Sequence, residues 1–324
     1  MKLSLARITV ATAFVITGFM MPAGAQDWPA RPIRIMVGFG AGGGTDAATR
    51  IVAEPLGELL GQRIVVENKP GAGGTIAGDI VAKGTKDGYN ALMISAGHTV
   101  SAVMIKSQPY DAVADFAPVG LIANSAFAVV VQKDFPANDL QGLITAIKKE
   151  PGKYNYATVG VGSTQHLTAE LFRQSAGLEA QAVSFRTTGE VVTALLRKDV
   201  AYAIDLAHAV RGQVAAGELK LLAVASSKRF PSLPDVPTMI ESGLPGLEVH
   251  GWYGLVFPAG VPGIVIEKTQ RALTEVLSRE PVRKQLEAIG AQAAVASPQE
   301  FGKLIADEVV RWRDVATKAG LQAQ

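Results

Sequence analysis

The chain has 324 residues, of which 48% are hydrophobic and 19% are charged, and it contains 34 glycines and no cysteine. This length supports two domains with separate cores, and the composition excludes a disordered, collagen-like or coiled-coil protein. The lack of cysteine excludes disulfide bonds, thiolate metal sites and a cysteine nucleophile.

The first 25 residues have the three parts of a secretory signal peptide. Lys2 and Arg7 are basic, residues 8–21 are apolar, and Ala23-Gly24-Ala25 is a small-residue cleavage site. The apolar stretch is shorter than the roughly 20 residues of a membrane-spanning helix. Removal of the signal peptide, with Lys2 and Arg7, leaves 29 basic and 29 acidic residues. This balance argues against binding of nucleic acid or of an anionic membrane. We therefore expect a periplasmic protein cleaved near Ala25.

Short β-branched runs alternate with amphipathic stretches along the rest of the chain. In the first part, strands are expected at 33–37, 63–66 and 91–95, with helices at 45–60 and 76–83. The pattern then recurs, with strands at 126–131, 154–158, 183–185, 201–204 and 219–225 and helices at 139–149 and 164–176. From Pro262 the tail is expected to be helical, in two or three pieces. This alternation is typical of an α/β protein with helices covering a parallel sheet.

The two βα-rich blocks predict two lobes. The chain is expected to cross between them near residue 125 and to return near residue 248, after the Pro- and Gly-rich stretch 230–246. Residues 26–125 and 248–324 would then form the first lobe, and residues 126–247 the second. Ligands of such folds bind in the crevice at the carboxyl ends of the strands.

A dense glycine run, Gly38-Phe39-Gly40-Ala41-Gly42-Gly43-Gly44-Thr45-Asp46, lies between the first strand and the first helix. Glycines let backbone amides turn toward one point, and the following helix adds the positive end of its dipole. The run therefore predicts an anion site made without a charged side chain, with Thr45 or Asp46 capping the helix. A second turn, Asn68-Lys69-Pro70-Gly71-Ala72-Gly73-Gly74-Thr75, follows the second strand and predicts the other wall of that site.

A nucleotide site is the main alternative. Gly38-x-Gly40-x-x-Gly43 matches the dinucleotide fingerprint, and Glu67 lies where a ribose ligand belongs. An exported protein meets little NAD, however, and the second glycine turn has no counterpart in that fingerprint. A dinucleotide-binding Rossmann-type enzyme thus stays the second interpretation.

Catalysis has little support in the sequence. The histidines His98, His166, His208 and His250 are too scattered to show metal-ligand spacing. Ser163, His166 and Asp205 could be imagined as a triad, but a helix cap at Ser163 or Thr164 explains the same residues better. We therefore predict a protein that is not an enzyme, with no metal and no cofactor.

Two charged residues end strands of the second lobe. Asp205 follows an apolar strand and could accept a proton from a ligand hydroxyl or amine, or cap the next helix. Arg186 ends the preceding strand and could pair with a second ligand carboxylate or form a surface salt bridge.

Eight stretches in order resemble the Bug-type substrate-binding proteins of tripartite tricarboxylate transporters. They are Trp28-Pro29-Ala30-Arg31-Pro32-Ile33, Gly42-Gly43-Gly44-Thr45-Asp46, Val66-Glu67-Asn68-Lys69-Pro70-Gly71-Ala72-Gly73-Gly74, Lys86-Asp87-Gly88-Tyr89, Asp115-Phe116-Ala117-Pro118-Val119, Gly162-Ser163-Thr164-Gln165-His166-Leu167, Ser232-Leu233-Pro234-Asp235-Val236-Pro237-Thr238 and Glu241-Ser242-Gly243-Leu244-Pro245. The chain departs from the family at Gly38 and Ala41, where proline is usual, and at residues 185–189 and 197–199 of the second lobe.

The resemblance implies a two-lobed, Venus flytrap fold of the type II-like periplasmic-binding-protein class. It implies a monomer that captures a small carboxylate (a di- or tricarboxylate, an aromatic carboxylate or an amino acid) and passes it to membrane permease subunits. A sensor that reports to a signalling partner would use the same site. The residues expected to contact the ligand are Phe39, Gly40, Ala41, Gly42, Gly43, Gly44, Thr45, Asp46, Pro70, Gly71, Ala72, Gly73, Gly74, His98, Gly162, Ser163, Thr164, His166, Arg186 and Asp205.

Overall fold

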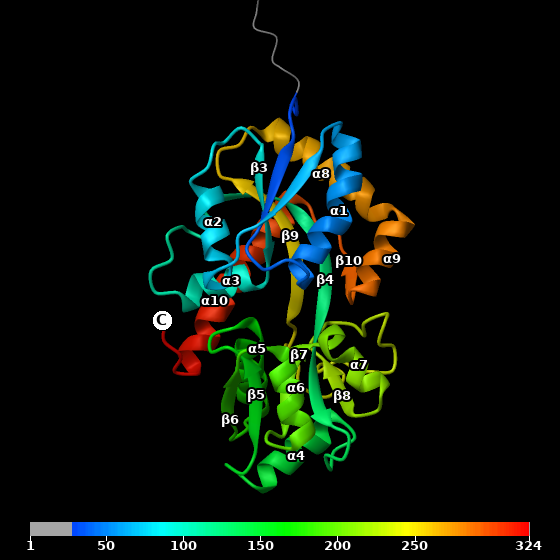
Figure 1. Cartoon of the computed structure of the whole chain (residues 1–324). Helices are drawn as coiled ribbons and strands as arrows, with labels where there is room; N and C mark the ends of the chain where they lie inside the picture. Colours follow the sequence, from blue (N-terminus) through cyan, green and yellow to red (C-terminus); the bar gives the residue numbers. More distant parts are fainter. Residues whose placement is uncertain (1–27, 324) are drawn as a thin grey trace, which may run out of the picture.

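The structure is a computed structural model that describes residues 28–323 (Figure 1). The predicted signal peptide and its cleavage site near Ala25 lie outside the described residues. Within residues 28–323, no helix combines the length and apolarity needed to cross a membrane.

The first set of elements forms a parallel βα unit. It contains β1 (Ile33–Val37), α1 (Gly44–Leu60), β2 (Ile64–Asn68), the short 3-10 helix η1 (Ala72–Gly74), α2 (Thr75–Ala82), β3 (Asn90–Ser95) and α3 (Gly97–Met104). β1 pairs in parallel with both β2 and β3, so that Ile35 lies opposite Val66 and Ala91. Because the three strands run in the same direction, the loops after β1, β2 and β3 all leave the same edge of the sheet.

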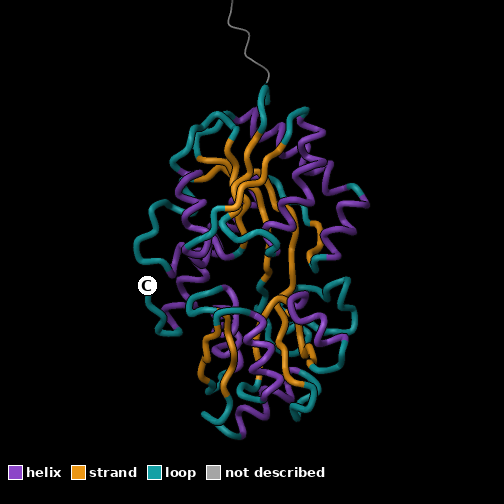
Figure 2. Tube along the Cα trace, in the orientation of Figure 1, coloured by secondary structure: helices purple, strands orange, loops and turns teal. Residues whose placement is uncertain are grey.

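Strand β4 (Phe116–Gln132) runs through both halves of the molecule (Figures 1 and 2). From Phe116 to Ala126 it pairs with β9 (His250–Pro258), and around Asn124 it also pairs with β10 (Ala291–Ala293). From Phe127 onward its partners are β7 (Tyr202–Leu206) and β8 (Leu219–Val224). We propose that this change of partners marks the boundary between the lobes.

The second lobe repeats the parallel arrangement of the first. Its other elements are α4 (Leu140–Lys149), β5 (Asn155–Val159), α5 (Thr164–Ala176), β6 (Gln181–Phe185), α6 (Thr188–Arg197), η2 (Ala207–Val210) and α7 (Arg211–Ala215). β5 pairs in parallel with β6 and β7. The loop after β5 therefore leads into α5 in the same way as the loop after β1 leads into α1.

The chain returns through β9 and ends in three helices, α8 (Gly263–Ser278), α9 (Glu280–Ala288) and α10 (Pro298–Lys318). Phe301 and Ile305 of α10 are buried in the core of the first lobe, whereas Trp312 and Val315 are buried in a core formed mainly by the second. Helix α10 therefore joins the lobes a third time, as its course in Figure 1 shows.

Most of the elements expected from the sequence are present, with small shifts of their ends. The strand 33–37 and the helix 164–176 have the expected bounds. Three helices, α3, α6 and α7, and two strands, β9 and β10, lie where the sequence analysis assigned no element. The strand expected at 126–131 is the second half of the much longer β4. Its first half, Phe116-Ala117-Pro118-Val119-Gly120, contains a proline and a glycine, which weaken the sequence signal of a strand.

Candidate functional site

A cavity of about 730 Å³ lies between the lobes. From the first lobe and the crossing strands it is lined by Phe39, Gly44, Thr45, Ala72, Gly73, Ser95, Ala96, Gly97, Val100, Ser101, Met104, Ile105, Ser125, Gly251, Trp252 and Tyr253. From the second lobe it is lined by Phe127, Val161, Gly162, Ser163, Thr164, Gln165, Leu206 and His208. This volume is within the range of small-molecule sites.

Helix α1 begins at the cavity wall. Its N-cap is Gly43, which has no side chain, so no side chain caps the amides of the first turn. Gly44 packs against the buried Tyr253, since an added β-carbon at Gly44 would lie 2.4 Å from the Tyr253 hydroxyl. The chain approaches the cavity closely here, and the uncapped amides carry the positive end of the helix dipole.

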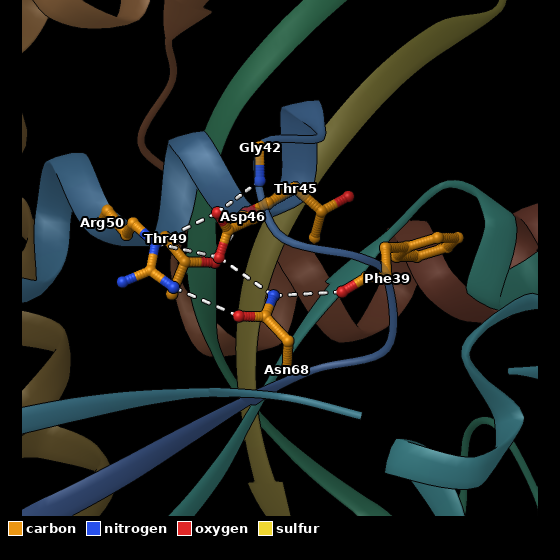
Figure 3. A network of polar contacts seen from close by, with 7 residues as sticks. All are labelled: Phe39, Gly42, Thr45, Asp46, Thr49, Arg50 and Asn68. Carbon is orange, nitrogen blue, oxygen red and sulfur yellow. Dashed lines mark hydrogen bonds and ion pairs between the residues drawn. The ribbon is translucent and has the colours of Figure 1, made fainter. Parts of the chain in front are cut away.

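A polar network fastens the loop before α1 (Figure 3). The Asp46 carboxylate accepts hydrogen bonds from the Gly42 amide (2.8 Å), from Arg50 Nε (3.0 Å) and from Asn68 Nδ2 (2.9 Å). Asn68 also donates to the Phe39 carbonyl (3.0 Å) and accepts from Arg50. Burial alone would raise the pKa of Asp46, but these hydrogen bonds and the Arg50 charge lower it. Asp46 is therefore a buried, paired carboxylate at the third helical position, and neither it nor Thr45 is the expected N-cap.

The second glycine turn lies against the first. Gly73 and Gly74 have φ of 65° and 96°, values that favour glycine, and Ala72 also has positive φ, at 46°. A β-carbon at Gly38 would lie 2.5 Å from the Gly74 Cα, so the two loops touch. Ala72 and Gly73 line the cavity, whereas Gly74 lies outside the lining, against Gly38 of the first loop.

Helix α3 also begins at the cavity. It follows β3 almost directly, its N-cap is Ala96, and no side chain caps it. Ser95, Gly97 and Ser101 line the cavity. Sequence reasoning missed this helix because only one residue, Ala96, separates it from β3. Its signal would have been the small polar residues within Ser95-Ala96-Gly97-His98-Thr99.

The second-lobe wall is the start of α5. Ser163 is the N-cap, and its hydroxyl accepts from the His166 amide (3.1 Å). The Gly162 amide donates to His166 Nδ1 (3.0 Å), so the imidazole ring also stabilises the turn. Burial lowers the pKa of His166. Two backbone amides that could have met a ligand are thus occupied within the turn.

Asp205 lies behind this wall at the end of β7. Its buried carboxylate accepts from Thr188 Oγ1 (2.8 Å), the Leu206 amide (2.8 Å) and Gln165 Nε2 (3.3 Å). Burial raises the pKa of Asp205, although these hydrogen bonds oppose the rise. Because Asp205 bonds to these groups and His166 Nδ1 bonds to Gly162, the three residues do not form a Ser–His–Asp relay.

The comparisons with known proteins agree on one family. The model of the tripartite tricarboxylate transporter family receptor matches residues 48–321. The chain belongs to this family. It is 34% identical to the protein BugT of Bordetella pertussis, over 97% of this chain and 95% of that protein. A receptor of this family is a periplasmic solute-binding protein and not a member of an enzyme family.

Solved structures of similar proteins show the same two-lobed α/β fold. The periplasmic binding protein BugD is 33% identical, with a TM-score of 0.75 over 92% of this chain and 100% of that one. MatC of Rhodopseudomonas palustris, solved with bound malate, is 31% identical, with a TM-score of 0.74 over 89% and 99% of the two chains. An R. palustris protein solved with adipate is 32% identical, with a TM-score of 0.79 over 92% and 100%.

The structure brings eight of the residues predicted as ligand contacts into the cavity lining of this receptor. They are Phe39, Gly44, Thr45, Ala72, Gly73, Gly162, Ser163 and Thr164. The others lie outside the lining, in the loops or behind the walls: Gly40, Ala41, Gly42, Gly43, Asp46, Pro70, Gly71, Gly74, His98, His166, Arg186 and Asp205. The contacts themselves stay predictions.

Two of the residues outside the lining have other surroundings. His98 is buried, its Nε2 lies 2.9 Å from the Ala112 carbonyl oxygen, and its ring stacks on Tyr110. Burial lowers the pKa of His98 to about 4, so the ring is neutral near pH 7. Arg186 is exposed, and its amide donates to Glu190.

Sequence reasoning missed the large side chains that shape the cavity. Trp252 and Tyr253 come from β9, Phe127 from β4, and Leu206 and His208 from β7 and η2. They are far apart in the sequence and meet only because β4 and β9 cross between the lobes.

The alternative nucleotide interpretation rested on the glycine fingerprint and on Glu67 as the ribose ligand. Its carboxylate lies 2.8 Å from Lys69 Nζ and 3.7 Å from Arg34, away from the cavity lining. The hydrogen bond from Lys69 lowers the pKa of Glu67. Glu67 is therefore paired with lysine and arginine in the position where a ribose ligand would have to be available.

Proposed function

We propose that the protein captures a small organic carboxylate in the interlobe cavity and delivers it unchanged to the membrane permease subunits of a tripartite tricarboxylate-type transporter. It acts as a monomer in the periplasm, after cleavage near Ala25, and uses no cofactor and no metal. Membership of the receptor family supports the binding role.

The observation that carries this proposal is the start of α1. Its amides are uncapped, they lie at the cavity wall, and the loop that presents them is fixed by Asp46 and Asn68. The uncapped start of α3 lies on the same wall. Oriented amides of this kind favour a carboxylate without needing a cationic side chain.

The related structures support the same ligand chemistry. MatC was solved with malate and the other R. palustris protein with adipate, and both ligands are organic acids. We therefore assign a carboxylate to the first-lobe wall, and propose that Phe39, Gly44, Thr45, Ala72 and Gly73 are among its neighbours.

Binding would proceed in two steps. The carboxylate first meets the first-lobe amides, and the second lobe then closes over the rest of the ligand because the closed state binds it more tightly. Each charge-assisted hydrogen bond would contribute about 1.5–3 kcal/mol.

A thermal-shift screen tests the proposal. The purified protein is heated with organic acids, amino acids, aromatic carboxylates, NAD and ATP, and a ligand of the folded state raises the melting temperature. We expect a shift from at least one organic acid and none from the nucleotides. A shift from a nucleotide alone would sink the proposal.

A further inference from the structure

The polar and apolar groups of the cavity lie on different parts of its wall. Amides and hydroxyls gather where α1, α3 and α5 begin. Large apolar side chains, among them Met104, Phe127, Leu206 and Trp252, form much of the remaining wall, together with the polar Ser125, His208 and Tyr253. A ligand that matches this wall has one polar end and a wide apolar body.

The described lining of the cavity contains no Lys, Arg, Asp or Glu. Its two titratable residues are His208 and Tyr253. Burial and the nearby Arg211 lower the pKa of His208, and burial raises the pKa of Tyr253, so both are neutral at pH 7. A second carboxylate or a ligand ammonium group would therefore depend on neutral groups of the wall alone, and a buried charge without enough such partners is costly.

The lobes also differ in the charge behind each wall. In the first lobe Asp46 is neutralised by Arg50, whose Nε lies 3.0 Å from it. In the second lobe Asp205 accepts only from neutral partners, and one of them, Gln165, lines the cavity. A buried carboxylate directly behind α5 disfavours an anion at that end.

The start of α5 offers little compensation for this. Its Ser163 hydroxyl and His166 ring occupy the amides of His166 and Gly162. The uncapped starts of α1 and α3 both belong to the first lobe. Two of the three helix starts at the cavity, and both of the uncapped ones, therefore lie on the first-lobe side.

We infer that the physiological ligand is an aromatic monocarboxylate, with its carboxylate on the first-lobe amides and its ring against Met104, Phe127 and Leu206. This assignment rests on the proposed function and narrows it to one class of acid. Aromatic side chains such as Phe127 and Trp252 favour a planar ring as their neighbour.

Benzoate and terephthalate test this inference, because terephthalate is the same ring with a second carboxylate. Isothermal titration calorimetry at pH 7.5 measures the dissociation constant of each. We expect benzoate to bind at least about tenfold more tightly, a difference of about 1.4 kcal/mol.

A substitution in the wall tests the cause of the preference. Gln165→Lys places a cation at the second-lobe end beside Asp205, so we expect it to narrow the difference between the two acids by about fivefold or more. Gln285→Lys is the matched control, because it adds the same charge at an exposed position of α9 outside the cavity lining. It should leave the ratio unchanged.

The outcomes separate the two proposals. Equal affinities, or tighter binding of terephthalate, adipate or citrate than of benzoate, would overturn this inference and leave the carboxylate site in place. A protein that binds neither benzoate nor any other organic acid of the screen would contradict the proposed function itself.

Discussion

The two walls of the cavity are built in the same way and use their amides differently. Each consists of a parallel strand, a turn containing glycine and a helix that begins at the cavity, β1–α1 in the first lobe and β5–α5 in the second. At α1 the N-cap is a glycine, whereas at α5 it is a serine whose hydroxyl occupies an amide. The N-cap residue therefore decides whether one amide of the first turn is available to a ligand or is bonded within the protein.

The buried acids near the two walls differ in their partners and in the direction of their pKa shifts. Asp46 has a guanidinium partner and a lowered pKa, whereas Asp205 has only neutral partners and a raised pKa. Both carboxylates hold their loops in place. Only Asp46 is balanced by a cation.

The largest effect is expected from Gly44→Val in the first wall. The new side chain would collide with the Tyr253 hydroxyl and fill the space in front of the α1 amides. Affinity for the best organic acid, measured by calorimetry, should fall roughly 100-fold, or about 2.8 kcal/mol.

The neighbouring residue provides the control. Gly43 has φ −73°, which any residue adopts, and an added β-carbon would lie 3.4 Å from the Gly40 carbonyl oxygen. Gly43→Ala should change the affinity by no more than about twofold. Similar losses in both variants would mean that the start of α1 is not where the acid binds.

Asp46→Ala tests the network that fastens the first loop. Removing the carboxylate leaves the Gly42 amide without its acceptor and takes from Asn68 Nδ2 one of its two acceptors, so the free energy of unfolding should fall by about 2 kcal/mol, measured by urea denaturation. Asp307→Ala removes an exposed carboxylate paired with Lys303, and should cost less than about 0.5 kcal/mol. If Asp46→Ala is as stable as Asp307→Ala, the loop is held by other contacts.

Gly290→Ala tests how the second lobe meets the first. Gly290 has φ +72°, and an added β-carbon would lie 2.1 Å from the His208 Cβ of the opposite lobe. The closed arrangement should become less favourable, with affinity about tenfold weaker. Small-angle scattering with saturating ligand should show a more open molecule. Gly263→Ala is the control, because nothing lies within 4 Å of the added atom.

Glu308 allows a pH test behind the first wall. This buried acid of α10 accepts from Thr99 Oγ1 (2.8 Å) and from Trp252 Nε1 (3.0 Å). Burial raises the pKa of Glu308 to about 7, although these hydrogen bonds act to lower it. The pKa of Glu308 is therefore higher in the folded protein than in the unfolded chain, where it is near 4.5. The stability that this difference contributes is fully present below pH 4.5 and is lost as the pH rises through about 7.

The melting temperature should therefore contain a component that falls between pH 5 and pH 7.5, and Glu308→Gln should remove it. The exposed Glu54 on α1 gives the control, since Glu54→Gln should leave the pH profile as it is in the unmodified protein. If the melting temperatures of all three proteins change with pH in the same way, Glu308 does not cause the fall between pH 5 and pH 7.5.

The smallest effect is expected from Arg186→Ala. The side chain is exposed and outside the cavity lining, so benzoate and terephthalate affinities should each change by less than about twofold. A selective loss of terephthalate affinity would instead restore Arg186 as the partner of a second carboxylate.

The sequence predicts local features better than it predicts the cavity. The glycine run before α1 is recognisable because strand, turn and helix follow one another within a few residues. Trp252, Phe127 and Leu206 could not be placed, since their meeting depends on where β4 and β9 cross. The position of Asp205 at the end of its strand was predictable. Its bond to Gln165 was not, because that bond joins two elements 40 residues apart.

The change of partners along β4 has a mechanical consequence. Ala126 is the last residue registered with β9, and Phe127 is the first registered with β7. A rotation of β4 between these two residues would leave the strand pairs on either side intact. Ser125 and Phe127, which flank this point, line the cavity. A ligand seated against them would therefore lie beside the place where β4 changes its partners.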